Sequence, residues 1–440
     1  MINLQLDEGI LSFLSASRYL WIGYSGGLDS TALLYKMAKD NRFRTKLRII
    51  HVNHGLSPNA AKWEHHCREI CKSLKLPLCI ERTKLADTSN LEEKARKARY
   101  ALYKKHLKPN DTLVLAHHLN DQAETFLLNL CRGAGIDGLA AMKPFKPFQK
   151  GFLWRPFLVY SRQEIEAYAQ TEGLNWVEDE SNLETHFGRN YLRHTVIPLL
   201  EQKWPAAIKH LAKASAHCQQ SQVHIDQLAQ LDCPELIAPK ETLNITPLLN
   251  LPKSRVLNAL RYWLRANNLQ IPRANFLEQI FCEVIHAKSS AKPQLTWGCS
   301  MLKRFQKTLY LLKDQAEMST EIFCEEVLWT SFPESLTITG SRLEALSSNE
   351  GIEVVPGSKV SVRFRQGGEV FYWRSQKKSL KKLFQEWQVP VWSRQTTPLI
   401  YINDVLAMIV GYAISDHFYH RGRDHLFTLG LALQESHEKH

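Results

Sequence analysis

The fold of this chain is decided by Tyr19-Leu20-Trp21-Ile22-Gly23-Tyr24-Ser25-Gly26-Gly27-Leu28-Asp29-Ser30. Its apolar first half predicts a buried strand, and the residues that follow, Thr31 to Lys39, predict a helix. A glycine-rich turn between a strand and a helix points free backbone N–H groups and the positive end of the helix dipole at an anion. The sequence therefore predicts a phosphate-binding loop rather than a plain tight turn. Its residues are Ser25, Gly26, Gly27, Leu28, Asp29 and Ser30.

No lysine follows Gly27, which distinguishes this loop from the loop in which a lysine neutralises the terminal phosphates. Asp29 occupies the loop in this chain. A carboxylate repels phosphate unless a divalent cation stands between them. We therefore expect Mg²⁺ at the loop, with Asp29 as its ligand.

Strands and helices alternate along the first half of the chain. After the loop and its helix, strands are predicted at Leu47–Asn53, Pro77–Glu81 and Thr112–Ala116, and helices from Ser57 to Lys75, from Leu91 to Leu107 and from Asp121 to Arg132. This alternation of strands and helices predicts the α/β class, with a doubly wound parallel sheet that binds ligands at the carboxyl ends of its strands.

The length of 440 residues predicts two or three domains. We expect an α/β domain at 1–205, a mainly helical domain at 206–345 and a small, basic α+β domain at 346–440. Within the middle domain, residues 251–288 predict two helices and residues 294–312 a pair of strands. The Ser-, Gly- and Glu-rich segment 343–356 is typical of a linker.

The net charge of +12 favours a polyanionic partner, nucleic acid first and an anionic membrane second. Asp7 and Glu8 near the N-terminus argue against a signal peptide, and the apolar run Leu406–Ile414 is far too short to span a bilayer. We therefore expect a cytoplasmic protein with no membrane partner.

The nine cysteines include no C-x-x-C pair. Cys67 and Cys71 lie one helical turn apart beside His65 and His66, which is compatible with a metal site. They also belong to an apolar stripe of a helix, and small buried cysteines are common in protein cores. The core interpretation is the stronger one.

A second dense cluster runs from His117 to Thr125, at the end of a predicted strand and the start of a helix. Asp121 and Glu124 are three residues apart, so their carboxylates project from one face of the first turn. Such a pair suits Mg²⁺ or a substrate ammonium group, although acidic residues also favour a helix N-terminus for electrostatic reasons alone.

Four arginines are further candidates for contacts to phosphate or to a base. Arg96 and Arg99 lie one turn apart in a predicted helix, where a solvated helix face is the alternative. Arg189 and Arg193 follow a polar loop that begins at Asp179, and by themselves they are uninformative.

These segments resemble, in their order along the chain, the tRNA(Ile)-lysidine synthetase family of PP-loop ATP pyrophosphatases. The resemblance rests on Ser25–Ser30, His51–His54, Asn90–Tyr100, His117–Thr125, Cys131–Leu139, Arg155-Pro156 and Asp179–Arg193, and in the C-terminal region on Val362–Glu369 and Lys381–Glu386. One departure is Asn120, where the family usually has an aspartate. We therefore expect Asp121 to be the essential carboxylate.

The resemblance implies an ATP-dependent ligase that joins free lysine to C2 of the cytidine at the first anticodon position of tRNA(Ile) with a CAU anticodon. It implies an adenylated cytidine intermediate and the release of AMP and pyrophosphate. The product, lysidine, converts codon specificity to AUA and amino-acid specificity from methionine to isoleucine. ATP is then a substrate and Mg²⁺ the implied metal.

The same resemblance, with charge considerations, suggests roles for individual residues. Asp29, Asp121 and Glu124 are the catalytic candidates. The loop from Ser25 to Ser30 would hold the departing pyrophosphate. The candidates for contacts to substrate and tRNA are Arg96, Arg99, His117, Arg189, Arg193, Arg363, Arg365, Lys381 and Lys382.

Residues 361–400 support a tRNA-binding surface, because they include eight basic residues against two acidic ones. Aromatic residues are interleaved with them, namely Phe371, Tyr372, Trp373, Phe384, Trp387 and Trp392. For these rings a core role is favoured over stacking on bases.

Two other functions compete with this interpretation. A sulfur-inserting tRNA enzyme of the same superfamily would usually carry cysteine pairs, and none is present. A non-catalytic tRNA-binding protein would be expected to lack the loop glycines, Asp29 or Asp121, yet all are present. A homodimer stays open, since no sequence feature argues for it.

Overall fold

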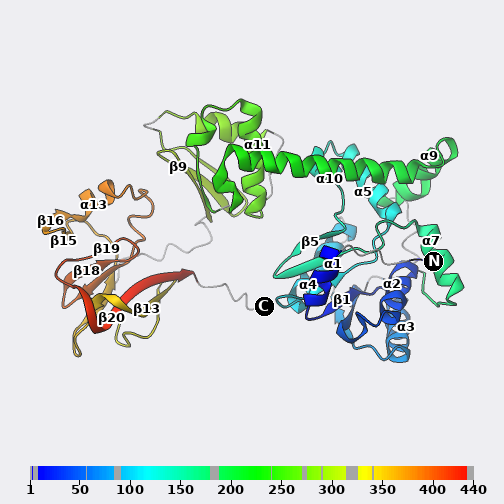
Figure 1. The fold of residues 1–440 in the computed structure, drawn as a ribbon, viewed down its shortest axis with the longest axis horizontal. Helices are drawn as coiled ribbons and strands as arrows, with labels where there is room; N and C mark the ends of the chain where they lie inside the picture. The colour runs from blue at the N-terminus through cyan, green and yellow to red at the C-terminus, as the bar shows by residue number, and fades with distance from the viewer. Residues whose placement is uncertain are drawn as a thin grey trace. The chain divides into compact units, whose positions relative to one another are not determined.

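The computed structural model describes residue 2 and residues 8–55, 57–83, 91–178, 188–238, 240–269, 275–288, 291–313, 326–338 and 341–433. The chain divides into two compact units, Met1–Leu231 and Asp232–His440 (Figure 1).

The first unit is built on a six-stranded sheet with the strand order β3-β2-β1-β4-β6-β5. All neighbouring strands are parallel except β5 and β6, which form an antiparallel hairpin. The strands are β1 (Leu20–Gly23), β2 (Leu47–Asn53), β3 (Leu78–Arg82), β4 (Thr112–Val114), β5 (Phe145–Phe148) and β6 (Gly151–Trp154). The predicted α/β fold with a parallel sheet is confirmed, whereas the β5–β6 hairpin was not predicted.

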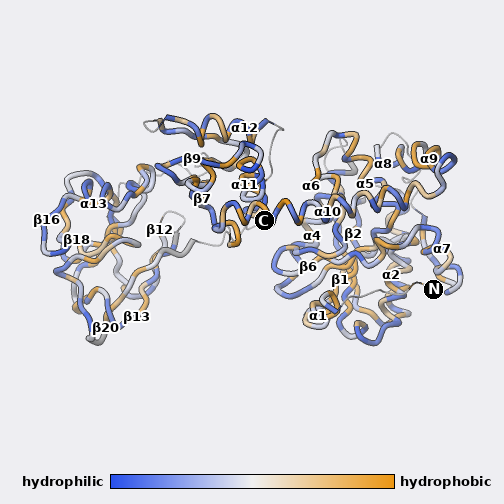
Figure 2. Tube along the Cα trace, turned by 45° about the horizontal axis from the view of Figure 1, so that its top comes forward, coloured by the Kyte–Doolittle hydropathy of each residue, from blue (hydrophilic) through white to orange (hydrophobic). Residues whose placement is uncertain are grey.

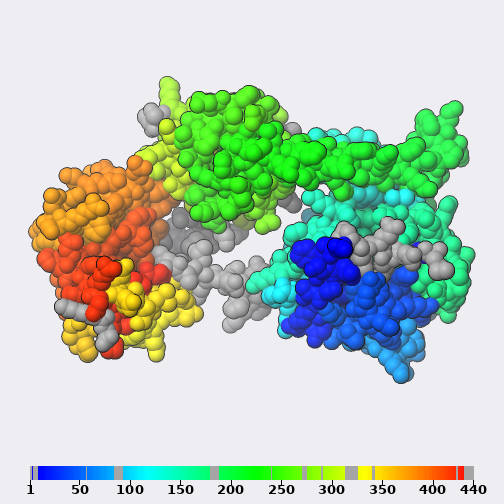
Figure 3. Space-filling view, in the orientation of Figure 1, coloured from blue at the N-terminus to red at the C-terminus, as the bar shows by residue number. Residues whose placement is uncertain are grey.

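Helices and short helical turns make up most of the rest of this unit. They are α1 (Glu8–Ala16), α2 (Leu28–Lys39), a 3₁₀ turn (Arg44–Lys46), α3 (Ala60–Ser73), α4 (Leu91–His106), α5 (Leu119–Cys131), α6 (Ile136–Leu139), α7 (Arg162–Thr171), α8 (Gly188–Tyr191), a π-helical turn (Leu192–Val196), α9 (Ile197–Lys203) and α10 (Ala207–Asp232). The space-filling view shows α1 at the surface of this unit (Figure 3).

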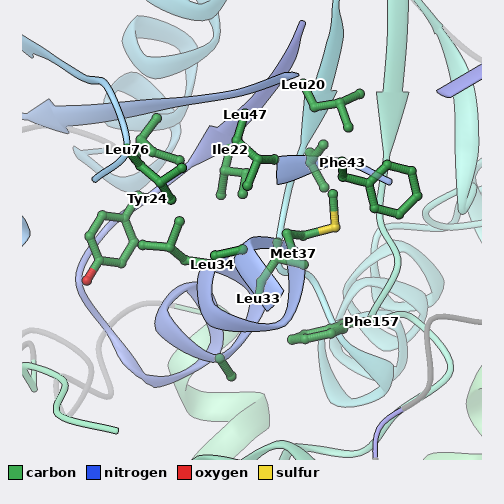
Figure 4. Close-up of a cluster of buried hydrophobic side chains, with 14 of the residues drawn as sticks. Leu20, Ile22, Tyr24, Leu33, Leu34, Met37, Phe43, Leu47, Leu76 and Phe157 are labelled. Carbon is green, nitrogen blue, oxygen red and sulfur yellow. The ribbon is translucent and has the colours of Figure 1, made fainter. Parts of the chain in front are cut away.

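The sheet is covered on both faces, as a doubly wound fold requires. On one face, Leu20 and Ile22 of β1 and Leu47 of β2 pack with Leu33 and Met37 of α2, and all are fully buried (Figure 4). A separate cluster that includes Ile50, Leu113, Leu153 and Tyr103 of α4 covers the other face. Strands buried on both faces are expected to be almost continuously apolar, and β1 is mainly hydrophobic in Figure 2.

The strand order reverses between β1 and β4. The chain passes from β1 outward through β2 to β3, and then returns to β4 on the other side of β1. In open α/β sheets, ligands bind outside the carboxyl ends of the strands at such a reversal. The loop from Ser25 to Ser30 follows β1, and the segment from Ala116 to His118 follows β4. The two predicted clusters therefore lie at the same point of the sheet.

The second unit begins with helices and an antiparallel sheet of the order β7-β10-β9-β8. These elements are two 3₁₀ turns (Pro234–Ile237 and Thr246–Leu248), β7 (Thr242–Asn244), α11 (Lys253–Ala266), α12 (Phe276–Gln279), a π-helical turn (Ile280–Ile285), β8 (Gln294–Trp297), β9 (Ser300–Phe305) and β10 (Thr308–Lys313). The helices predicted at 251–288 are confirmed, and three strands stand where a pair was predicted at 294–312.

The remainder of this unit is mainly β structure. Its elements are β11 (Val327–Leu328), β12 (Leu336–Ile338), β13 (Ser341–Glu353), β14 (Val360–Arg363), β15 (Val370–Trp373), β16 (Gln376–Ser379), α13 (Leu380–Glu386), β17 (Leu399–Ile402), β18 (Val405–Ile409), β19 (Ala413–Ile414) and β20 (Tyr419–Leu433).

The linker predicted at 343–356 is wrong, because residues up to Glu353 belong to the long strand β13, which pairs with β20. Leu343 and Ile352 are fully buried, but most of the residues between them are not. An antiparallel strand with one face open to water can have a polar composition that resembles a linker.

Among the helices in the described ranges, none combines the length and apolar character that a bilayer crossing needs.

Candidate functional site

The loop between β1 and α2 is held by its own hydrogen bonds. The hydroxyls of Ser25 and Ser30 lie 3.0 Å apart, and Ser30 donates to the carbonyl of Gly27 at 3.0 Å. Gly27 is the N-cap of α2 and has no side chain that could occupy the first N–H groups of the helix. The helix N-terminus is therefore available to an anion.

Gly26 has a backbone conformation that favours glycine, with φ of +88°. A Cβ at this position would also lie 3.0 Å from Cys67 Sγ and 3.1 Å from Val177 Cγ2. Gly27 differs, because its φ is −75° and an added Cβ would come no closer than 3.6 Å to a neighbouring atom.

We predict that Gly26→Ala lowers the free energy of unfolding by about 1–2 kcal/mol, the usual penalty for a side chain in a left-handed conformation. Gly27→Ala, the matched control, should have a smaller effect. Urea denaturation of both variants would measure this difference. An equal loss of stability in the two variants would contradict the argument.

Asp29 lies in the first turn of α2, with its carboxylate turned toward the end of β4. Its Oδ2 is 3.6 Å from His118 Nε2 and 3.9 Å from Arg162 Nη1. Its Oδ1 is buried and has no hydrogen-bond partner among the described residues. Burying a carboxylate oxygen without a partner is unfavourable, and carboxylates are preferred ligands of Mg²⁺. The residues present therefore fit a divalent cation at Asp29.

The N-terminus of α5 is closed by a reciprocal capping arrangement. The backbone N–H of His118 donates to Asp121 Oδ2 at 2.9 Å, and the backbone N–H of Asp121 donates to His118 Nδ1 at 3.4 Å. Asp121 therefore does stabilise the helix end, which was the alternative to a ligand-binding role. Burial disfavours protonation of His118, but the negative charges of Asp121 and Asp29 outweigh it and raise the pKa of this imidazole.

Asp121 and Glu124 form a group of four charged residues with Arg189 and Arg193. Arg189 donates to Glu124 at 2.8 Å and to Asp121 at 3.2 Å. Arg193 donates to Glu124 at 2.6 and 3.0 Å and to Asp121 at 3.4 Å. The Glu124 side chain is only 1% exposed, so its charge is neutralised by the arginines and not by water. We call these residues the Asp–Glu–Arg cluster.

The charges around Asp121 determine the protonation state of its carboxylate. Burial tends to raise the pKa of Asp121, but the positive charges of His118 and Arg189 hold this pKa well below its ordinary value. Asp121 is therefore ionised at neutral pH.

His117 lies beside the cluster and receives a hydrogen bond from a buried arginine. Arg155 Nε donates to His117 Nδ1 at 3.3 Å, and Arg155 Nη1 donates to the carbonyl of Lys143 at 2.7 Å. Burial, together with the positive charges of Arg155, Arg189 and Arg96, lowers the pKa of His117 to about 3. The imidazole is therefore neutral, and with Nδ1 accepting a bond its proton lies on Nε2.

We predict that Arg155→Met raises the pKa of His117 above about 3, because one of the neighbouring positive charges is removed while the imidazole stays buried. The control is Arg162→Met. It removes an arginine that lies 3.9 Å from Asp29 Oδ2 instead of the one that donates to His117. The measurement is the pH titration of the His117 ring carbon in ¹³C-labelled protein. An unchanged titration in Arg155→Met would mean that the charge of Arg155 does not contribute to this pKa.

Arg96 and Arg99 lie on α4 and are both exposed. Arg96 stacks over the ring of Tyr100, with 5.3 Å from its guanidinium carbon to the ring centre. Burial and the charge of Arg99 lower the pKa of His54 to about 4, so a neutral imidazole lies near this arginine. Because both arginines are exposed, both can contact a ligand.

The predicted basic residues of the C-terminal region differ in their surroundings. Arg363 is paired with Glu326 and Asp404, and Arg365 Nε is 3.9 Å from Glu369. Lys381 and Lys382 are exposed on α13. The two lysines are therefore better placed than Arg363 to meet a polyanion.

The aromatic residues of this region have mainly a structural role. Phe371 and Phe384 are fully buried, and Trp373 and Trp387 pack against the same core. The prediction that these rings belong to the core is confirmed for these four residues.

The cysteine pair is also confirmed as part of the core. Cys67 and Cys71 on α3 are 0% and 1% exposed and pack against β1, β2 and α2. Burial raises the pKa of both thiols to about 12, so both stay protonated at neutral pH.

Sequence reasoning assigned no role to His118, Arg155 or Arg162. His118 could have been noticed as the residue directly before a helix that contains Asp121 three positions later. Arg155 gave no signal besides its place in the family resemblance. Asn120 uses its side-chain carbonyl oxygen to accept the backbone N–H of Arg162 at 3.0 Å.

Family models match three parts of the chain: a PP-loop domain at residues 3–200, a TilS substrate binding domain at 243–310 and a TilS substrate C-terminal domain at 360–429. The chain is 44% identical over 403 residues to the tRNA(Ile)-lysidine synthase of Legionella pneumophila (strain Lens), covering 91% of this chain and 92% of that protein. It is 40% identical over 429 residues to the enzyme of that name from Coxiella burnetii, covering 95% and 94% of the two chains. Its identity with the Escherichia coli O157:H7 protein is 37% over 420 residues, covering 93% and 95%. The chain belongs to the tRNA(Ile)-lysidine synthase family of ATP-dependent ligases.

Proposed function

We propose that this enzyme joins lysine to C2 of the cytidine at the first anticodon position of tRNA(Ile) with a CAU anticodon. The observation that carries the proposal is the convergence of a phosphate-binding loop, a carboxylate suited to Mg²⁺ and the Asp–Glu–Arg cluster at one strand-order reversal of the sheet. ATP activates the base and lysine replaces the activated oxygen.

The reaction needs activation, because the C2 carbonyl of cytosine is amide-like and its oxygen is a poor leaving group. In the first step this oxygen attacks the α-phosphate of ATP, which forms a C2–O–AMP bond and expels pyrophosphate. In the second step the lysine ε-amine attacks C2, and the C2–O bond breaks to release AMP. The amine loses its proton on the way to the product.

The loop from Ser25 to Ser30 would hold the phosphates that leave as pyrophosphate. Its support is the open N-terminus of α2, where N–H groups and the helix dipole favour negative charge. Asp29 would hold Mg²⁺ through its unpartnered Oδ1. The ion would neutralise charge on the phosphates.

The Asp–Glu–Arg cluster would bind the lysine. Free lysine carries ammonium groups and a carboxylate, and the cluster offers two carboxylates and two arginines. A lysine ammonium would replace an arginine on Glu124 or Asp121, and the freed arginine would be available to the lysine carboxylate. Deprotonation of the ε-amine would be assisted by the same carboxylates.

His117, Arg96 and Arg189 would position the cytosine and the phosphates. The neutral His117 can donate from Nε2 to an acceptor on the base, since Arg155 occupies its Nδ1. Arg96 is exposed, so it can approach a phosphate.

The C-terminal residues Lys381 and Lys382, with Arg363, Arg365 and Arg99, would attract the tRNA by charge. Binding of this kind releases counterions and should weaken as salt rises. We keep a homodimer as a separate question, since nothing in the proposed chemistry requires a second subunit.

The test is incubation of the purified protein with ATP, labelled lysine and tRNA(Ile) bearing a CAU anticodon. The proposal expects transfer of label to the tRNA, with AMP and pyrophosphate released in equal amounts. Release of ADP, or AMP formation accompanied by sulfur transfer without any need for lysine, would refute it.

A further inference from the structure

Three side chains with metal-binding atoms meet on β3 and α4, away from the loop at β1. Cys79 and Glu81 are two residues apart in β3 and therefore project from the same face of the strand. His106 is the last residue of α4. The thiol, carboxylate and imidazole ligand atoms all lie within 4.8 Å of one another.

The distances are close to those of a metal site. His106 Nε2 lies 3.9 Å from Cys79 Sγ and 2.5 Å from Glu81 Oε1. Zinc–ligand bonds of about 2.0–2.3 Å in a tetrahedron place neighbouring ligand atoms about 3.3–3.6 Å apart. The sulfur–nitrogen distance is therefore nearly right, and the nitrogen–oxygen distance has to open by about 1 Å, within reach of a small rotation of the Glu81 side chain.

We propose that Cys79, Glu81 and His106 bind one zinc ion, with water as the fourth ligand. Thiolate and imidazole together select zinc-class ions, whereas Mg²⁺ prefers oxygen ligands. The side chains of Glu81 and His106 are each 22% exposed, so an ion and a water molecule can reach them. The imidazole of His106 already contacts both the Glu81 carboxylate and the Cys79 thiol, so a single ion at this point could bind all three side chains.

The proposed site has a structural role. β2 lies between β3 and β1 in the sheet, so the zinc is separate from Asp29. The ion would link the C-terminal end of α4 to the edge strand β3. Helix α4 also carries Arg96 and Arg99. The neighbouring Lys104 and Lys105 are cationic and oppose the ion, so we expect moderate affinity.

The experiment uses the full chain after treatment with a chelator and dialysis. Zn²⁺ is titrated in competition with a chromophoric chelator, and Co²⁺ is used in parallel as a spectroscopic probe. We expect one equivalent of Zn²⁺ and a thiolate-to-cobalt charge-transfer band. Cys79→Ser should abolish the band, and both Cys79→Ser and His106→Ala should weaken Zn²⁺ binding by at least about tenfold.

Cys131→Ser is the matched control, since Cys131 is an exposed free thiol elsewhere in the chain. It should leave the charge-transfer band and the stoichiometry unchanged. Thermal unfolding without metal confirms that each variant folds, and Glu81→Gln offers a milder third variant. Absence of stoichiometric Zn²⁺ binding, or equal affinity in wild type and the Cys79→Ser and His106→Ala variants, would overturn the proposal.

Discussion

Replacing Asp29 by asparagine is expected to lower kcat/KM for lysidine formation by at least about 100-fold, the usual loss when a group that organises charge in an active site is removed. The amide keeps the size of the side chain but lacks the negative charge that suits Mg²⁺ at the buried Oδ1. The measurement is label transfer from lysine to tRNA over a range of Mg²⁺ concentrations. The variant should need more Mg²⁺ than the wild type and still react more slowly.

Asp40→Asn is the matched control for this experiment. Asp40 is the C-cap of the same helix and pairs with Arg42 at the surface. Asp40→Asn therefore replaces a carboxylate by an amide at the opposite end of α2 from the loop. Its activity should equal that of the wild type. Full activity of Asp29→Asn, or an unchanged requirement for Mg²⁺, would contradict the role given to Asp29.

The sequence predicted the elements that local pattern determines. The strand β1, the glycine turn and α2 are adjacent in the chain, and their apolar and glycine positions are enough to define them. Asp121 and Glu124 were placed on one face of a helix for the same reason. The β5–β6 hairpin was missed because its strands are only four residues long and join through Gln149 and Lys150, a connection without the usual Asn-Gly or Asp-Gly signal.

The partners of these residues were beyond the reach of local pattern. Arg189 and Glu124 are 65 residues apart, and Arg155 and His117 are 38 apart. Both arginines were visible as charges, but only the folded chain shows that Arg189 and Arg193 occupy the carboxylates while Arg155 holds the imidazole. The strand order likewise came from the structure, since the alternation of strands and helices predicts a parallel sheet without saying where its direction reverses.

The ion pairs with Arg189 and Arg193 change how Asp121 and Glu124 can bind a ligand. The sequence predicted that Asp121 and Glu124 suit Mg²⁺ or a substrate ammonium group, yet each carboxylate is already bound by Arg189 and Arg193. A ligand ammonium must therefore compete with internal cations. Asp121 also caps α5, so its replacement would change the helix end as well as the charge. Glu124 gives the cleaner test.

Glu124→Gln is expected to raise the KM for lysine by about 10- to 150-fold, which corresponds to the 1.5–3 kcal/mol of a hydrogen bond to a charged group. The amide keeps one acceptor oxygen but cannot neutralise an ammonium group in a site where the side chain is 1% exposed. The KM for ATP should stay close to the wild-type value. Initial rates with each substrate varied in turn would separate the two constants.

The effect of Glu124→Gln on stability is measured separately from its effect on the KM for lysine. Removing the charge takes away a buried carboxylate to which Arg189 and Arg193 donate, so the free energy of unfolding should fall by about 1–3 kcal/mol, which urea denaturation can measure. Glu172→Gln provides the same change at a surface carboxylate that pairs with Lys39, where exposed pairs contribute about 0–1 kcal/mol. If Glu124→Gln folds and keeps the wild-type KM for lysine, the carboxylate only holds the two arginines and the ammonium group of lysine binds elsewhere.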